Sequence, residues 1–341
     1  MRLRWGILLV LLAKTACLAD HSPELNMPTG SIEINDETAY LLLHHDMRPV
    51  IRARGFKWTE GPLWIEDGGY LLFSDIPNNV VHKYKPGVGT EVYLRESGAT
   101  GLFEGDYSQG SNGLLLDAAG RLVLMQHGDR RVAVMDAPLD APMPSYLALA
   151  DRYDGARLNS PNDAVYHSDG SLYFTDPPYG LADILEDERK ELPFQGIYRL
   201  DPDGKLVLLD DSVSYPNGIG LSPDEKILYV AVSDHDDAVW LAYDIESDGS
   251  IANKRIFFDA NRWAGTEGEP GYPDGMAVHS SGYIFATGPG GVWLFSPDAE
   301  PVARILTGRA TANCTLSSDE ETLYISAHDT LMSLRIGGSL K

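Results

Sequence analysis

The chain has 341 residues, of which 43% are hydrophobic and 23% are charged, so a disordered or fibrous protein is excluded. Fifty acidic residues against 27 basic ones give a formal net charge of −23. That charge repels phosphate backbones and anionic lipid surfaces, which argues against binding to nucleic acid or to a membrane. The length is compatible with two domains or with one large all-β domain, and it leaves the oligomeric state open.

The first 19 residues have the three parts of a secretory signal peptide. Arg2 and Arg4 form the basic start, and the apolar run at 6–13 is too short to span a bilayer as a helix. The small residue Ala19 precedes the expected cleavage point. The sequence therefore predicts that residues 1–19 are removed and that the protein is secreted or periplasmic. A lipoprotein signal and a buried N-terminal helix are the alternatives.

A hairpin unit recurs six times through the rest of the chain. Each copy is a polar turn, often with glycine, that runs into a short β-rich strand, which is the signal of a β-hairpin. Aliphatic residues that anchor these strands lie roughly 40 to 55 residues apart, at Leu71, Leu122, Leu172, Leu228, Ile284 and Leu323. A repeat of about this length, with several short strands per unit, is typical of propeller blades.

Further strand-like runs follow the hairpins and would form the third strands of the blades. They are Val80–Tyr84, Arg131–Met135, Gly196–Leu200, Val239–Asp244 and Gly291–Ser296. Six units favour a closed ring, because a ring leaves no exposed end faces. We therefore predict an all-β, six-bladed β-propeller over residues 47–341, preceded by a lead-in segment at 20–46 with a short helix within 33–46. A β-sandwich would not explain the repeat.

One carboxylate or amide side chain occupies the same place in every unit, ten or eleven residues before the anchor. The six are Glu60, Asn112, Asn162, Asn217, Asp274 and Asn313. Each begins an apolar run, and equivalent positions of a closed ring converge on its axis. An all-oxygen set with few charges suits one divalent cation, most simply Ca²⁺, with Zn²⁺, Mg²⁺ and Mn²⁺ as alternatives. The simpler interpretation, a cap of the turn before the strand, fits Asn313 well and Glu60 poorly.

The second strand of each hairpin runs back to the face where the first began, so its end should lie beside the same mouth of the channel. The residues at these ends are Asp75, His127, Asp176, Asp234 and His328. For Asp75 and Asp176 we favour turn caps, whereas His127 is open between a pocket residue and a core histidine. Loops at 181–193 and 263–272 are expected to roof the pocket.

The chain resembles the gluconolactonase, SMP-30 and luciferin-regenerating-enzyme-like proteins over about residues 56–336. The resembling stretches are Thr59-Glu60-Gly61-Pro62, Ser111-Asn112-Gly113-Leu114, His127-Gly128, Asn159-Ser160-Pro161-Asn162-Asp163, Phe174-Thr175-Asp176-Pro177-Pro178-Tyr179-Gly180, Pro216-Asn217-Gly218, Pro273-Asp274-Gly275 and Asn313-Cys314-Thr315. Together they resemble the bacterial gluconolactonase branch more than the animal one, because animal members carry an arginine where this chain has Ser160.

The resemblance implies a six-bladed propeller with one divalent metal, usually calcium, on its axis. By motif match, Glu60, Asn217 and Asp274 would be metal ligands, with Asn162 at or beside the metal. It also implies hydrolysis of a lactone, a small-molecule substrate such as an aldonolactone.

The expected mechanism assigns a role to each of the other candidates. The metal would polarise the lactone carbonyl, and Asp274 would take the proton of the attacking water. A metal-bound carboxylate is a poor base, so His127, expected to titrate near neutrality, is the second candidate and a substrate contact. Asn112 and Asn162 would hold the substrate.

Two rival functions remain at this point. The same site could hydrolyse a phosphotriester or an aryl ester, or the protein could be a non-catalytic secreted propeller with a structural metal. The sequence contains no Gly-x-Ser-x-Gly elbow, which argues against a serine hydrolase.

Overall fold

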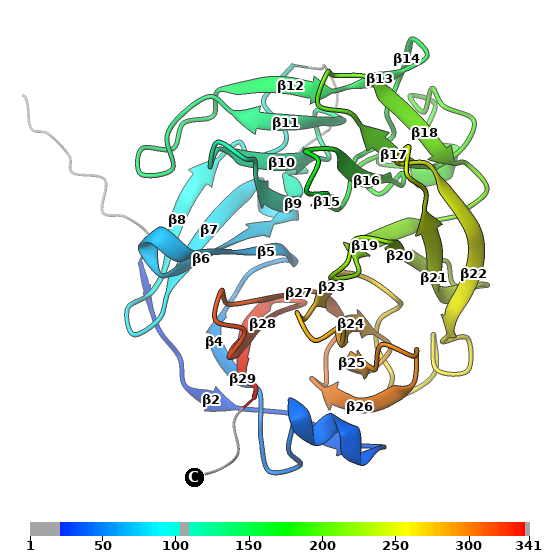
Figure 1. Ribbon diagram of the computed structural model, residues 1–341. Helices are drawn as coiled ribbons and strands as arrows, with labels where there is room; N and C mark the ends of the chain where they lie inside the picture. Colours follow the sequence, from blue (N-terminus) through cyan, green and yellow to red (C-terminus); the bar gives the residue numbers. More distant parts are fainter. Residues whose placement is uncertain (1–20, 103–108, 338–341) are drawn as a thin grey trace, which may run out of the picture.

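In the computed structural model, described here for residues 21–102 and 109–337, antiparallel sheets of four or five strands are arranged around a central channel (Figure 1). There are six such sheets in the described part of the chain, so the predicted six-bladed β-propeller is confirmed. The predicted signal peptide at 1–19 lies outside the described residues. Within the described ranges, every helix is too short or too polar to traverse a bilayer.

In the first three blades the strands follow one another in chain order from the channel outward, as simple meanders. Blade 1 contains β5 (Thr59–Ile65), β6 (Tyr70–Asp75), β7 (Val80–Lys85) and β8 (Gly89–Arg95). Blade 2 contains β9 (Ser111–Leu116), β10 (Leu122–Gln126), β11 (Arg131–Met135) and β12 (Tyr146–Ala150). Blade 3 contains β15 (Ala164–Tyr166), β16 (Leu172–Asp176), β17 (Gly196–Leu200) and β18 (Leu206–Asp210).

Blades 4 and 5 repeat this pattern, and blade 6 joins the two ends of the chain. Blade 4 contains β19 (Pro216–Leu221), β20 (Ile227–Ser233), β21 (Ala238–Ile245) and β22 (Ile251–Asp259). Blade 5 contains β23 (Met276–Val278), β24 (Ile284–Gly288), β25 (Gly291–Phe295) and β26 (Pro301–Leu306). Blade 6 contains β27 (Thr311–Leu316), β28 (Thr322–Ala327), β29 (Thr330–Arg335) and β4 (Val50–Arg54).

The ring closes because β4, from the N-terminal part of the chain, pairs antiparallel with β29 near the C-terminal end, as Figure 1 shows in blue and red. Thr330 lies opposite Arg54 in this ladder, and Ser333 lies opposite Val50. The inner strands β27 and β5 then contact each other across the closure. No blade in the described structure is therefore left at an open end of the ring.

The described part of the lead-in segment, residues 21–46, lies along the outside of the ring. Its short strands β1 (Ser22–Pro23), β2 (Met27–Pro28) and β3 (Ser31–Ile34) add to the outer edges of blades 1, 6 and 5. The helix expected within 33–46 is present as the 3₁₀ helix η1 (Glu37–Leu41). Asp36 caps it, because its side chain accepts a hydrogen bond of 2.9 Å from the amide of Thr38.

Four further short elements occur in the connections. They are the hairpin of β13 (Arg152–Tyr153) and β14 (Ala156–Arg157), and the 3₁₀ helices η2 (Glu66–Gly68), η3 (Ile76–Asn78) and η4 (Ile184–Glu186).

The hydrophobic core lies between neighbouring blades rather than at the centre of the molecule. Phe174 of β16 stacks on Tyr198 of β17 at 5.2 Å, and both pack with Met125 of β10 in the preceding blade. Trp240 and Trp293 join blades 4 and 5, with ring centroids 6.2 Å apart. Complete burial of such a side chain stabilises the fold by roughly 1.5 to 3 kcal/mol. These contacts leave the channel free for polar side chains.

Candidate functional site

Five of the six predicted ring residues line one cavity of about 530 Å³ at one end of the channel. Glu60 and Asn112 lie in the inner strands β5 and β9, and Asn217 lies in β19. Asn162 and Asp274 lie just before β15 and β23. Each of the five positions lies at or just before the start of the inner strand of its blade. The closed ring therefore brings their side-chain oxygens together near its axis.

The three asparagines of the ring touch one another in series. The amide nitrogen of Asn112 donates to the side-chain oxygen of Asn162, whose own amide nitrogen donates to the oxygen of Asn217. The amide nitrogen of Asn217 then donates to the hydroxyl of Ser233 at 2.9 Å. The side-chain oxygen of Asn112 is buried and has no hydrogen-bond partner in the described structure. A buried acceptor of this kind requires a partner, which a ligand of the cavity would supply.

Glycines after the ring residues allow the blades to approach this closely. A Cβ atom at Gly61 would lie 2.2 Å from the carbonyl oxygen of Asn112, and one at Gly218 would lie 2.3 Å from that of Asp274. At Gly275 a Cβ atom would lie 2.0 Å from the side chain of Asn313. The recurring ring-residue-plus-glycine pattern therefore reflects contact between the backbones of adjacent blades.

Asp163 breaks this glycine pattern and is a site residue that the sequence analysis missed. It follows Asn162 at the position where Gly61, Gly113, Gly218 and Gly275 stand in four of the other blades. Its carboxylate accepts hydrogen bonds from the amide of Ala164 at 2.9 Å and from the side chain of Asn313 at 3.3 Å. The absence of glycine here was the sequence signal that could have identified it.

Three carboxylates, Glu60, Asp163 and Asp274, therefore lie close to the axis. Burial raises the pKa of Asp163 to about 7. Burial also raises the pKa of Glu60, and the charge of Asp163 adds to the effect. For Asp274, burial raises the pKa well above its usual range, and the charges of Glu60 and Asp163 raise it further.

No cationic side chain compensates this charge, because the described residues that line the cavity include no lysine and no arginine. The ring residues supply carboxylate and amide oxygens, three carboxylates repel one another, and one buried acceptor has no partner, which is the environment that a hard divalent cation requires. The residues present therefore fit a bound divalent ion.

Asn313 differs from the other five ring residues. Together with Asp163 it lines a second cavity of about 500 Å³. The other lining residues of this cavity come largely from the inner strands of the blades. Its side-chain oxygen accepts from the amide of Cys314 at 2.8 Å, a local bond that agrees with the capping interpretation. Cys314 is buried and is the one free cysteine in the described structure.

Of the five residues at the ends of the second strands, only His127 lines the cavity. Asp75 accepts from the amides of Lys57 and Trp58, and Asp176 accepts from those of Asn159 and Ser160. These bonds reach back at least 16 residues along the chain, so these side chains hold an earlier segment in place, and the expectation that they cap their own turns was wrong. Asp234 and His328 do not line the cavity in the described structure, but each is next to its wall, since Asp234 follows Ser233 and the ring of His328 lies 5.4 Å from that of Trp58.

His127 is in the cavity wall but does not titrate where it was expected to. Its Nε2 lies 3.3 Å from the side-chain oxygen of Asn162, and its Nδ1 has no partner among the described residues. Burial lowers the pKa of His127 to about 4. The imidazole is therefore neutral at neutral pH and is a weaker base than a histidine with an ordinary pKa.

Aromatic and apolar side chains form the rim of the cavity. The loop at 263–272 contributes Tyr272, as expected, but the loop at 181–193 contributes none of the described lining residues. Tyr179, just before that loop, lines the cavity instead. Trp58 completes the rim near Glu60, since its indole nitrogen donates to the Glu60 carboxylate at 3.4 Å.

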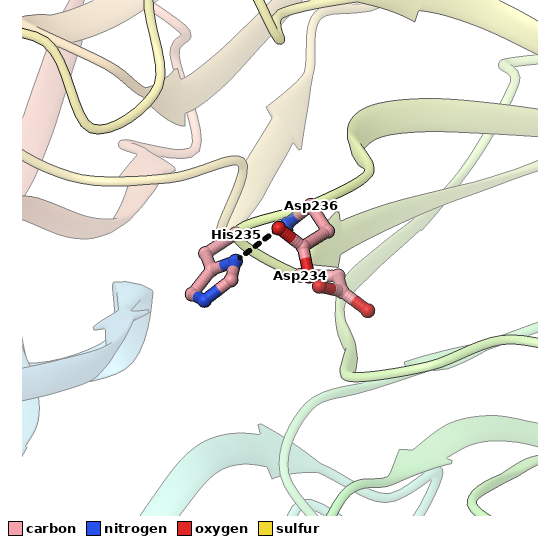
Figure 2. Close-up of side chains that lie close together, drawn as sticks. All are labelled: Asp234, His235 and Asp236. Carbon is pink, nitrogen blue, oxygen red and sulfur yellow. Dashed lines mark hydrogen bonds and ion pairs between the residues drawn. The ribbon is translucent and has the colours of Figure 1, made fainter.

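A second group of potential metal ligands lies at the surface, in the turn between β20 and β21. Figure 2 shows Asp234, His235 and Asp236 with an ion pair of 2.9 Å between His235 and Asp236. The side chains of His235 and Asp236 are largely exposed, at 71% and 87%. Only Asp234 of this group is partly buried, so the group lacks the enclosed environment of the axial ring and is not a comparable site.

Comparison with known proteins agrees with this fold. Residues 58–329 match the model of the SMP-30/gluconolactonase/LRE-like region. A gluconolactonase of Zymomonas mobilis is 36% identical over 287 residues, which cover 83% of this chain and 80% of that protein. The pentonolactonase XacC of Haloferax volcanii is 25% identical over 274 residues, covering 78% and 80%. The solved structure of the gluconolactonase XC5397 from Xanthomonas campestris has a TM-score of 0.79 and 28% identity, covering 93% of this chain and 99% of that one.

Proposed function

This chain belongs to the SMP-30/gluconolactonase/LRE-like family, and we propose that it is a calcium-dependent lactonase that opens a sugar lactone to its acid. Its similarity to gluconolactonases in sequence and structure makes it a hydrolase of the lactonase type. Our proposal goes beyond this similarity in three respects: the dependence on a metal, the choice of Ca²⁺ and the class of lactone. An aldonolactone is the expected substrate, since both curated relatives described above are named for the hydrolysis of such sugar lactones.

The observation that carries the proposal is the convergence of Glu60, Asn162, Asn217 and Asp274 on one cavity without a compensating cationic side chain. These four residues would hold the ion, and Asp163 adds negative charge just behind them. A bound divalent cation supplies Lewis acidity, which stabilises negative charge on the oxygen of an ester carbonyl.

The remaining groups of the cavity suit a small neutral ring with several hydroxyls. The side-chain oxygen of Asn112 is free to accept a hydrogen bond from a hydroxyl, and His127 presents a neutral imidazole beside it. The described lining offers no lysine or arginine side chain to pair with a phosphate or carboxylate on the substrate. The side chains of Trp58 and Tyr272 at the rim would shield one side of a bound ring from water.

For the proton of the attacking water, Asp274 stays the first candidate base and His127 the second. Asp274 lies in the cavity wall and is not completely buried, so that water can reach its carboxylate from the cavity. Its charge is partly committed to the ion, which weakens it as a base. His127 is not one of the proposed metal ligands, but its low pKa makes it a weak proton acceptor at neutral pH.

A panel of substrates tests the proposed reaction. We expect the purified protein with Ca²⁺ to hydrolyse five- and six-membered aldonolactones, with the release of acid followed by pH-stat. A phosphotriester and an aryl ester, assayed beside them, should react at least about 100-fold more slowly in kcat/KM, a difference of about 2.7 kcal/mol in transition-state binding. A faster phosphotriester reaction would favour the alternative hydrolase, and no reaction at all would favour a binding propeller.

We also propose that the protein is exported, on the sequence of residues 1–19 alone. When the full chain is expressed in a bacterium with a secretion pathway, the mature protein should begin at Asp20. Mass spectrometry of the periplasmic fraction and of the medium measures this mass. A cytoplasmic protein that keeps residues 1–19 would contradict the proposal.

A further inference from the structure

Tyr179 reaches the axial ring from one side of the cavity, and the roles proposed above do not use it. It lies in the segment 177–180, between β16 and η4. It lines the cavity together with Ser233, Asn217 and Asp274, and its hydroxyl is close enough to all three for polar or electrostatic interaction. Its ring is stacked on that of Tyr215, with 5.7 Å between the centroids. The phenol oxygen therefore lies beside two of the proposed metal ligands.

The hydrogen bonds around Ser233 identify which hydroxyl can donate to a ligand. The Ser233 hydroxyl donates its single proton to the backbone carbonyl of Pro273 at 2.5 Å, and its oxygen accepts from the amide of Asn217 at 2.9 Å. Ser233 has no second proton, so of these two neighbouring hydroxyls only that of Tyr179 can donate to a ligand. The phenol O–H can rotate about its C–O bond, and it keeps its proton at neutral pH because a phenol has a pKa of about 10.

The segment that carries Tyr179 is fixed by its backbone. The buried hydroxyl of Ser160 donates to the carbonyl of Pro177 at 2.6 Å and accepts from the amide of Gly180 at 2.8 Å. A Cβ atom at Gly180 would lie 2.6 Å from that of Ser160 and 2.8 Å from that of His127. The segment therefore packs tightly on both neighbours, which fixes the position of the phenol before a substrate arrives.

We infer that Tyr179 is a further catalytic residue, whose phenol O–H donates a hydrogen bond to the carbonyl oxygen of the bound lactone. The inference rests on the proposed function, because it assigns a role within the same reaction. Water adds its oxygen to the carbonyl carbon, the ring C–O bond breaks, and a proton goes to the ring oxygen, which leaves as the alcohol of a hydroxy acid. Negative charge grows on the carbonyl oxygen during the addition, and a fixed donor stabilises it there more than in the substrate.

The variant Tyr179→Phe removes the donor and keeps the ring that stacks on Tyr215. We expect kcat to fall about 100-fold, the usual loss for one such donor, while KM rises no more than about tenfold. The melting temperature and the affinity for Ca²⁺, measured by calorimetry, should stay at their wild-type values. Tyr173→Phe is the matched control, since it removes a buried hydroxyl that donates to the carbonyl of Gly249 at 2.9 Å, away from the cavity. This control should keep full activity.

Two results would overturn the inference. One is a Tyr179→Phe variant that keeps kcat within threefold of the wild type. The other is a variant whose affinity for Ca²⁺ falls and whose kcat returns at saturating Ca²⁺, because the hydroxyl would then only position Asn217.

Binding of a non-hydrolysable sugar lactam gives a second readout that does not depend on turnover. The lactam keeps the ring and the carbonyl oxygen, so calorimetry with the calcium-loaded protein should show about tenfold weaker binding to Tyr179→Phe than to the wild type. Equal binding to both, or no binding to the wild type, would also overturn the inference. A wild type that binds the lactam and hydrolyses no lactone would contradict the proposed function, and the comparison of the two affinities would still decide the role of Tyr179.

Discussion

Replacement of Asp274 by alanine should reduce lactone hydrolysis about a thousandfold or more and leave the protein folded. Asp274 is the ring residue with two proposed tasks, since its carboxylate would hold the ion and would accept the proton of water. Loss of a group that acts with its neighbours as a unit removes most of the shared effect. Steady-state kinetics on an aldonolactone at saturating Ca²⁺ measures the loss.

The melting temperature of the same variant separates a functional defect from a folding defect. In the ion-free protein, Asp274 repels the charges of Glu60 and Asp163. Removal of its carboxylate relieves that repulsion, so ion-free Asp274→Ala should melt no lower than the ion-free wild type. Asp236→Ala is the matched control, because it removes an exposed carboxylate from the surface group of Figure 2.

Two outcomes would contradict this assignment. Near-normal turnover by Asp274→Ala would remove Asp274 from the mechanism. Loss of activity in Asp236→Ala would instead move the functional ion to the surface group at 234–236.

The fold could be predicted from the sequence because its repeat is local. Each blade begins with a hairpin whose turn and strands are adjacent in the chain, and the anchors Leu71 and Leu228 lie in the second strands β6 and β20. A closed ring was expected from the six units, but the pairing that closes it could not be predicted in the same way. Thr330 lies opposite Arg54, and these partners are set by tertiary contact rather than by a local pattern. The short strands of the lead-in segment have no periodicity that would reveal them.

The positions of the candidate site followed from the repeat, but their chemistry did not. Equivalence between blades places Glu60 and Asn217 at the same level of the channel, which the cavity bears out. The pKa of His127 depends on how completely the ring buries it, and the sequence carries no measure of that burial. Asp163 stands out as unusual only once the structure shows why the equivalent position is glycine in other blades, namely the close contact between neighbouring blades.

Removal of the ion should stop hydrolysis and lower the melting temperature. An ion that binds only the folded protein stabilises it by about 2.7 kcal/mol when present at 100 times its dissociation constant. For a chain of this size that corresponds to a fall of about 5 °C after treatment with EDTA. Differential scanning calorimetry and an activity assay before and after verified removal measure both effects. Added Ca²⁺ should restore them, and unchanged activity in the stripped protein would end the proposal of a catalytic ion.

The stripped protein should also become less stable as the pH rises from about 4 to about 7. The folded pKa of Asp163 is about 7, against an ordinary value of 3.8, so over this interval the folded chain binds more protons than the unfolded chain. Stability falls with rising pH wherever the folded state holds the extra proton, and the raised pKa values of Glu60 and Asp274 act in the same direction. The lowered pKa of His127 acts in the opposite direction, so the test compares the wild type with Asp163→Asn, which keeps His127. In EDTA the melting temperature of the wild type should fall with pH relative to that of Asp163→Asn, and saturating Ca²⁺ should remove most of this difference. Equal slopes for the two proteins in EDTA would show that Asp163 carries no raised pKa, and the physical reason for an ion at the axis would be weakened accordingly.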